Sequence, residues 1–373
     1  MSRLTAVVEQ GQSLWLDYIR RDLVDGGELA ALVAEGGVRG LTSNPAIFEK
    51  AIAGSTLYDA SLGGHVRAGQ KDPEQLVEAV AIEDIRMAAD VFWPVYQQTG
   101  GVDGYVSLEV SPRLASDTAR TLDEARRLWR TVGRPNLMIK VPGTAAGVPV
   151  VRQLIAEGIN VNVTLLFSRK AYAAVAEAYL KGLEQRVAQG EPIDKIASVA
   201  SFFISRIDTV MDAQLASRGE EALTLAGRIA IANAKLAYQD FLALMNSPRW
   251  QALAARGAQP QRLLWASTGT KNPALRDTLY VEQLIGPATV NTVPPATLAA
   301  FRDHGVTHRT LDAEVSVAQS VMTAVDRLGL PFEAATDQLV VDGVKLFVDA
   351  WDQLLAAVAA KRDALLAADR ADA

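Results

Sequence analysis

Short apolar runs about as long as a β-strand recur along this 373-residue chain, with amphipathic stretches of helical periodicity between them, as over residues 168–187 and 227–244. This alternation is typical of a parallel sheet built from βα units, because each parallel connection needs a crossover. Eight candidate strands occur, the number that closes an α/β barrel, so we predict an α/β fold of the (β/α)8 TIM barrel type. They span residues 14–19, 40–44, 104–110, 136–141, 159–167, 196–205, 262–270 and 288–293.

Two connections are longer than a crossover requires, and neither has the Pro-, Gly- or Ser-rich composition of a linker. We therefore predict a single barrel domain over residues 1–373, with insertions at about 46–101 and 294–331. The C-terminal segment, 332–373, has an amphipathic pattern and is expected to form a helix or helix pair that folds back over one barrel end.

Composition excludes several classes of function. The net charge is −6 and no Lys/Arg block occurs, so the broad electrostatic attraction of nucleic-acid binders is missing. The chain has no cysteine, which excludes disulfides, a thiol nucleophile and thiolate metal sites. We find neither a secretory signal pattern nor an apolar run of membrane-spanning length, and expect a cytoplasmic protein without a membrane partner.

Polar residues interrupt or directly follow nearly every predicted strand, although a parallel strand covered on both faces should be apolar. The residues that stand out are Asp17, Asn44, Glu109, Lys140, Asn162, Thr164, Ser201, Arg206, Ser267 and Lys271. Asn162 and Thr164 are two positions apart, so both side chains face the same side, which in a barrel we interpret as the lumen. Because the carboxyl ends of barrel strands meet at one mouth, these groups are predicted to form one pocket.

Each of these residues also has a structural interpretation. A single Asp or Glu near a strand end is usually a cap or one member of an ion pair, and isolated Ser or Thr hydroxyls usually satisfy backbone groups. For Lys140 that interpretation is weaker, because an ammonium within an apolar strand is costly unless it is paired or neutral. The occurrence of all these residues together favours a functional pocket. Lys235, inside a predicted helix, is interpreted as a solvated side chain.

Other catalytic motifs are missing. The chain contains neither a phosphate-binding P-loop, nor a Gly-x-Gly-x-x-Gly turn after a strand, nor a Gly-x-Ser-x-Gly elbow. His304 and His308 have the spacing of a metal pair, but Gly305 weakens the helix between them and no carboxylate motif accompanies them. We therefore expect no metal.

A lysine remains as the nucleophile. Lysine attacks a carbonyl only when its amine is neutral, and burial at a barrel mouth disfavours the ammonium form. The resulting protonated imine accepts electrons from a breaking carbon–carbon bond, and a pair of carboxylates can carry the protons that this chemistry moves. Glu109 and Asp17 are the available pair, while Arg206 with Lys271 suits a phosphate at the far end of the substrate.

At these residues the chain resembles the transaldolases, specifically a longer bacterial subgroup, and the match runs in order through nearly all predicted strands. The matching segments are Gly-Leu-Thr-Ser-Asn-Pro (40–45), Val-Ser-Leu-Glu-Val (106–110), Ile-Lys-Val-Pro-Gly-Thr (139–144), Asn-Val-Asn-Val-Thr-Leu-Leu-Phe-Ser (160–168) and Ala-Ser-Thr-Gly-Thr-Lys-Asn-Pro (266–273). The resemblance implies transfer of a dihydroxyacetone unit from sedoheptulose 7-phosphate or fructose 6-phosphate to glyceraldehyde 3-phosphate or erythrose 4-phosphate. This reaction belongs to the non-oxidative pentose phosphate pathway and uses no metal and no cofactor.

The resemblance also implies roles for individual residues. Lys140 would form the Schiff base, Glu109 would act as acid/base through a water that Thr164 positions, and Asp17 would take the proton of the substrate hydroxyl. The implied substrate-binding residues are Asn44, Asn162, Ser201, Phe203, Arg206, Ser267 and Lys271. Better-known transaldolases end the seventh strand in Ser-x-Arg, whereas Ser267-Thr268-Gly269 leads here to Lys271, which we expect to replace that arginine.

Two alternatives stay open. Fructose 6-phosphate aldolases, which release free dihydroxyacetone, resemble this barrel but are shorter and carry a tyrosine where Phe203 stands. The second alternative is a catalytically silent barrel that binds sugar phosphates. Neither the preferred ketose nor the oligomeric state, monomer or homodimer, follows from the sequence.

Overall fold

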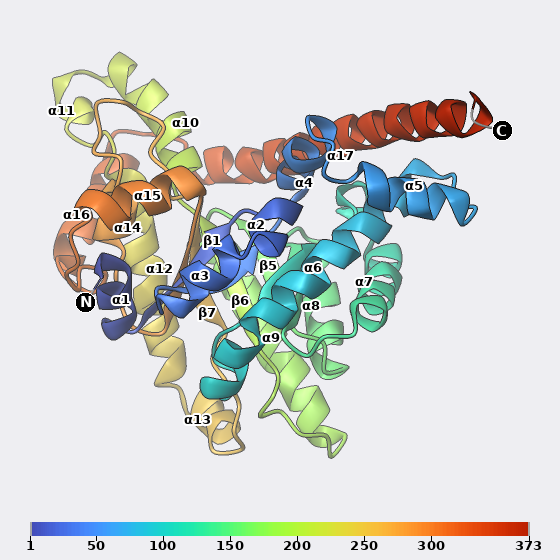
Figure 1. The fold of residues 1–373 in the computed structure, drawn as a ribbon. Helices are drawn as coiled ribbons and strands as arrows, with labels where there is room; N and C mark the ends of the chain where they lie inside the picture. Colours follow the sequence, from blue (N-terminus) through green and yellow to red (C-terminus); the bar gives the residue numbers. More distant parts are fainter. Residues whose placement is uncertain (1, 372–373) are drawn as a thin grey trace.

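The computed structural model describes residues 2–371 and contains a closed barrel of parallel strands in the order β1 to β8 (Figure 1). Each strand pairs with the next along the chain, and β8 closes the ring by pairing with β1. The strands are β1 (Gln12–Asp17), β2 (Val38–Thr42), β3 (Val106–Glu109), β4 (Leu137–Pro142), β5 (Val161–Leu166), β6 (Ser198–Phe203), β7 (Arg262–Ala266) and β8 (Thr289–Val293). The predicted (β/α)8 barrel is therefore confirmed.

Every predicted strand overlaps an observed one, and the differences lie at the ends. The largest is in β7, which ends at Ala266, whereas the prediction continued to residue 270. Ser267 adopts a left-handed conformation, with φ of 56°, and this turns the chain out of the extended path. The polar residues after Ala266 therefore belong to a loop at the barrel mouth.

Helices surround the barrel, and several of them begin at side chains that accept hydrogen bonds from otherwise unpaired backbone N–H groups. Asp117 caps α7 and Ser168 caps α9, through bonds from the amides of Arg120 and Ala171. The helices between β3 and β8 are α7 (Thr118–Val132), α8 (Gly147–Ala156), α9 (Arg169–Ala188), α10 (Ser205–Leu215), α11 (Glu220–Leu223), α12 (Ile229–Met245), α13 (Pro248–Ala254) and α14 (Leu279–Gln283), with the 3-10 turns η1 (Pro112–Leu114) and η2 (Ala216–Arg218).

The remaining helices lie at the amino-terminal side and in the segments predicted as insertions. They are α1 (Arg3–Glu9), α2 (Arg21–Asp25), α3 (Glu28–Ala34), α4 (Pro45–Ala53), α5 (Asp59–Arg67), α6 (Pro73–Gln98), α15 (Pro295–His304) and α16 (Val315–Arg327). The long helix α6 packs against both β2 and β3, so it also serves as their crossover. Within the described part of the chain, no helix has the length and apolar character needed to cross a membrane.

The C-terminal segment forms one 40-residue helix, α17 (Phe332–Ala371). It contacts α4, α6, α10, η1 and β5, elements from opposite sides of the barrel (Figure 1). It thus crosses the barrel end at which β5 leads into α9. Met1, Asp372 and Ala373, which belong to the predicted domain, lie outside the described residues.

The amino ends of the strands are closed by a buried polar network. The Asp103 carboxylate accepts hydrogen bonds from Ser13 Oγ (2.6 Å), Trp15 Nε1 (3.2 Å) and Arg262 Nη2 (2.9 Å). Arg262 also donates to Ser13 Oγ (2.7 Å). Because this end is filled by paired groups, the opposite end is the one that remains open for a ligand.

Candidate active site

A cavity of about 570 Å³ lies at the carboxyl ends of the strands, the end at which barrel enzymes place their catalytic residues. Nine of the residues predicted for the site line it together: Asp17, Asn44, Lys140, Thr164, Ser201, Phe203, Arg206, Ser267 and Lys271. Two do not. Glu109 contacts Lys140 but lines a neighbouring cavity of about 430 Å³, and Asn162 lies among buried side chains.

Lys140 and Glu109 are a buried pair on neighbouring strands. They are directly opposite in the register of β4 and β3, and Lys140 Nζ lies 3.3 Å from Glu109 Oε2. The amine also donates a hydrogen bond to the Ser43 carbonyl at 3.1 Å. Burial raises the pKa of Glu109, and the positive charge of Lys140 opposes that rise. The carboxyl group can therefore hold a proton beside the amine.

Asp17 provides the second carboxyl group, at the end of β1. Its Oδ1 accepts a hydrogen bond from Thr42 Oγ1 at 2.8 Å, because the two residues are paired in the register of β1 and β2. Burial also raises the pKa of Asp17, against the opposing effects of Lys140 and the Thr42 hydroxyl. Two carboxyl groups with raised pKa values thus lie in the environment of one lysine.

Thr164 and Asn162 lie on β5, next to the strand β4 that carries Lys140, and they differ in their hydrogen-bond partners. Asn162 donates to Ser107 Oγ (3.0 Å) and accepts from Ser201 Oγ (2.7 Å). Thr164 Oγ1 is buried without a hydrogen-bond partner in residues 2–371, and so is Glu109 Oε1. Buried polar atoms usually have a partner, so these two are available to a ligand or a water.

Asn44 lies where β2 leads into α4. Its side-chain oxygen caps α4 by accepting a hydrogen bond from the Ile47 amide at 3.0 Å. That bond fixes the orientation of the side chain at the edge of the cavity. The other end of the amide then remains for a hydroxyl group of a ligand.

Arg206 and Lys271 supply positive charge on the β6–β7 side of the cavity. The Arg206 guanidinium lies 5.2 Å from the centre of the Phe203 ring, and burial lowers the pKa of Arg206. Ser267 Oγ hydrogen-bonds Ser205 Oγ at 2.9 Å, which ties the end of β7 to the start of α10. This side of the cavity suits a phosphate group.

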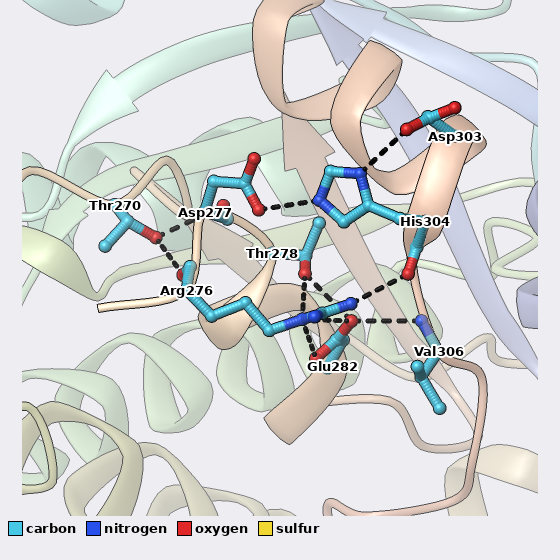
Figure 2. Close-up of polar contacts among 8 residues, drawn as sticks. All are labelled: Thr270, Arg276, Asp277, Thr278, Glu282, Asp303, His304 and Val306. Atoms are coloured by element: carbon cyan, nitrogen blue, oxygen red, sulfur yellow. Dashed lines mark hydrogen bonds and ion pairs between the residues drawn. The ribbon is translucent and has the colours of Figure 1, made fainter. Parts of the chain in front are cut away.

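The loop that carries Lys271 is anchored by a polar network at its far end (Figure 2). Thr270 Oγ1 donates to the carbonyls of Arg276 and Asp277, and Arg276 forms an ion pair with Glu282 at 3.1 Å. His304, considered above for a metal pair, contacts the Asp277 carboxylate at 2.8 Å through Nε2. Across residues 2–371, no group of three or more His, Asp or Glu side chains has the arrangement needed to hold a metal ion.

Sequence reasoning missed several residues that line the cavity: Tyr18, Thr42, Lys50, Thr292 and Phe347. Lys50 and Phe347 come from α4 and α17, outside the barrel strands, so strand patterns could not have found them. The interpretation of Lys235 was wrong. Its side chain is 4% exposed and donates to the Ala313 carbonyl at 3.1 Å, because α16 and the segment before it cover that part of α12.

Comparison with known proteins finds relatives along most of the chain. A family model described as transaldolase/fructose-6-phosphate aldolase matches residues 14–358. A transaldolase of Thiobacillus denitrificans is 51% identical over 349 residues, 93% of this chain and 97% of the relative. A transaldolase of Thermobifida fusca is 49% identical over 360 residues, 96% of this chain and 98% of the relative. A transaldolase of Trichodesmium erythraeum is 46% identical over 365 residues, 95% of this chain and 96% of the relative.

Proposed function

The chain belongs to the transaldolase/fructose-6-phosphate aldolase family, and from that premise we propose that it is a transaldolase acting through a Schiff base on Lys140. It moves a dihydroxyacetone unit from fructose 6-phosphate or sedoheptulose 7-phosphate to glyceraldehyde 3-phosphate or erythrose 4-phosphate. The observation that carries this proposal is the buried contact between Lys140 Nζ and Glu109 Oε2. A binding protein has no need of an amine enclosed in this way.

Imine formation is the first step. The neutral amine of Lys140 attacks C2 of the ketose, the carbon–nitrogen bond forms, and the carbonyl oxygen leaves as water after two proton transfers. Glu109 carries these protons, since its carboxyl group contacts the amine and has a raised pKa. The unpartnered hydroxyl of Thr164 supports a role in holding the water through which they pass.

Carbon–carbon cleavage follows. Asp17 takes the proton from the C4 hydroxyl, the C3–C4 bond breaks, and its electron pair moves into the imine while an aldose phosphate leaves. The dihydroxyacetone unit stays on Lys140 as an enamine, and the same steps in reverse join it to an acceptor aldehyde. Asp17 lines the cavity beside Lys140, which supports this role.

Substrate orientation depends on both ends of the cavity. Arg206 and Lys271, with Ser267, bind the phosphate, while Asn44 and Ser201 bind the dihydroxyacetone hydroxyls and Asn162 positions Ser201. Because these charged sugars do not cross membranes unaided, we place the enzyme in the cytoplasm. Its reaction belongs to the non-oxidative pentose phosphate pathway.

The second candidate activity within the family is release of free dihydroxyacetone. It requires a water activated beside the imine, for which a tyrosine hydroxyl would serve. Phe203 occupies the corresponding place, with its ring centre 5.2 Å from that of Phe167 and no hydroxyl to donate. This favours transfer over release.

Borohydride trapping tests the proposal. The protein is incubated with fructose 6-phosphate, reduced with sodium borohydride, digested and mapped by mass spectrometry. We expect a reduced dihydroxyacetone adduct on the peptide that contains Lys140, formed only when fructose 6-phosphate is present. A protein that binds the sugar without any adduct would be the silent barrel instead. Release of free dihydroxyacetone at the rate of fructose 6-phosphate loss, with erythrose 4-phosphate present, would make it an aldolase.

A further inference from the structure

The C-terminal helix α17 places an aromatic ring over the Schiff-base lysine. Phe347 is 5% exposed and lines the active-site cavity, and its ring centre lies 5.7 Å from Lys140 Nζ. The amine also contacts the Ser43 carbonyl and the Glu109 carboxylate. Phe347 therefore places an apolar ring beside an amine that two polar groups also contact.

A glycine lets α17 come this close to the barrel. A Cβ atom built on Gly343 would lie 2.8 Å from Leu165 Cδ2 and 3.6 Å from Arg206 Nη1. Leu165 directly follows Thr164 and is fully buried, so its side chain is surrounded by close packing. One turn before Phe347, the helix is thus seated against the strand that carries Thr164.

Beyond Phe347, α17 is tied to the opposite side of the mouth. Asp352 forms an ion pair with Arg113 at 2.6 Å, next to η1. Lys361 donates to the Ser55 carbonyl and to Asp59, both at 2.7 Å, next to α5. Because the helix is held on both sides of the barrel axis, the ring of Phe347 has a fixed place in the site.

We propose that Phe347 is a specificity-determining residue, which keeps water from the dihydroxyacetone intermediate on Lys140 until an aldehyde acceptor arrives. This inference rests on the proposed function. An apolar group at the reactive nitrogen excludes water there and so prevents hydrolysis of a reactive intermediate. The acceptor can still bind, because Arg206 and Lys271 also line the cavity and their charges suit its phosphate group.

The intermediate has two possible fates, which differ in what C3 of the enamine takes up. In transfer, C3 of the enamine attacks the aldehyde carbon, the new carbon–carbon bond forms, the aldehyde oxygen takes up a proton, and water then hydrolyses the imine of the product ketose and frees Lys140. In release, C3 takes up a proton, water adds to C2 of the imine, and the carbon–nitrogen bond breaks to give dihydroxyacetone and the free amine. Both fates consume one water, but release consumes it while Lys140 still carries only the dihydroxyacetone unit, so an apolar ring that excludes water at that stage favours transfer.

The test measures both fates in Phe347 variants of the full chain. Phe347→Ala removes the ring, and Phe347→Met keeps an apolar side chain of similar length. The matched control is Leu346→Ala, since Leu346 is the adjacent residue on α17 and is 54% exposed. Free dihydroxyacetone and transferred product are quantified by chromatography, with fructose 6-phosphate as donor and erythrose 4-phosphate as acceptor.

We expect Phe347→Ala to raise the ratio of release to transfer by about tenfold, equivalent to about 1.4 kcal/mol between the two barriers. Phe347→Met should bring the ratio of release to transfer most of the way back to that of the unaltered protein, and Leu346→Ala should leave the ratio unchanged. A variant that has only lost stability would melt earlier and make less of both products at the same ratio. That result, or equal ratios in all variants, would overturn the inference.

Failure of the inference and failure of the proposed function give different results. If the unaltered protein forms the Lys140 adduct and transfers dihydroxyacetone, and the ratio does not respond to Phe347, only the role of Phe347 is wrong. If the unaltered protein forms no adduct, the proposed function itself is wrong.

Discussion

Lys140 and Glu109 occupy directly paired positions on neighbouring barrel strands, with Nζ 3.3 Å from Oε2. The hydrogen-bonding register of β3 and β4 therefore fixes the distance between the amine and the carboxyl group, and this distance does not depend on a loop. A proton can pass between the two groups, directly or through one water, without a change of backbone conformation.

Lys140→Ala is expected to abolish transfer, by on the order of 10⁴-fold or more, because it removes the amine that contacts the Glu109 carboxylate. A coupled assay of glyceraldehyde 3-phosphate formation measures the loss, and circular dichroism shows that the barrel remains folded. Lys235→Met is the matched control, since Lys235 is also buried but lies on α12 and contacts the Ala313 carbonyl. Retained activity in Lys140→Ala would contradict the mechanism.

Glu109→Gln is expected to slow imine formation by about 10²-fold or more, the usual loss when a general acid/base is removed. The amide keeps the size of the carboxyl group, so packing around Lys140 should change little. Rapid quenching with borohydride at successive times gives the rate of adduct formation. If that rate equals the rate of the unaltered protein, Glu109 has no part in proton transfer.

Arg206→Ala and Lys271→Ala should weaken binding of phosphorylated substrates. Each charged hydrogen bond contributes about 1.5–3 kcal/mol, so KM for fructose 6-phosphate should rise roughly 10- to 100-fold. The reference substrate is unphosphorylated fructose, for which neither substitution should alter kcat/KM. If fructose is affected as strongly as fructose 6-phosphate, the two residues do not bind the phosphate.

Asp208 should make stability depend on pH. Burial raises its pKa to about 7, against hydrogen bonds from the Ala230 amide and Tyr280 Oη, while Asp212 raises it further. In the unfolded chain its pKa is near 3.8, so between these values the folded state binds the extra proton. The free energy of unfolding should therefore fall as pH rises through this window, by at most about 1.4 kcal/mol per unit, and level off above it.

Asp208→Asn removes the titrating carboxyl group, so the free energy of unfolding should no longer fall with pH in this window. Relative to the unaltered protein, the variant should therefore be more stable at pH 8 than it is at low pH. Urea unfolding at intervals from pH 5 to pH 8 measures both proteins. Parallel curves would show that Asp208 does not titrate in this range.

Asp103→Ala should destabilise the barrel without changing the chemistry of the site. It leaves Arg262 buried without its partner and removes the acceptor of Ser13 and Trp15, at a cost of about 3–5 kcal/mol. The comparison is Asp90→Ala, which breaks the exposed pair with Arg134 and should cost less than about 1 kcal/mol. Chemical unfolding gives both values, and similar losses in the two variants would contradict this account of the network.

Much of the site could be predicted from local sequence because the barrel has a regular plan. Side chains alternate along a strand, and parallel strands end at the same mouth, so Asp17, Lys140 and Thr164 could be placed together from their positions alone. Phe347 and Lys50 could not, because they come from helices whose packing depends on long-range contacts. The burial of Lys235 could not be predicted for the same reason, since the helix that covers it, α16, comes from a distant part of the chain.

Local sequence was enough to predict the eight strands, the polar residues at their ends and the family of the chain, because hydrophobic periodicity and short motifs are local properties. The surroundings of Lys140 depend on tertiary contacts. The strand register brings Glu109 into contact with it, and the seating of Gly343 against Leu165 brings Phe347 over it. Both contacts join residues far apart in the sequence, so they exist only once the barrel has closed and α17 has packed across its mouth.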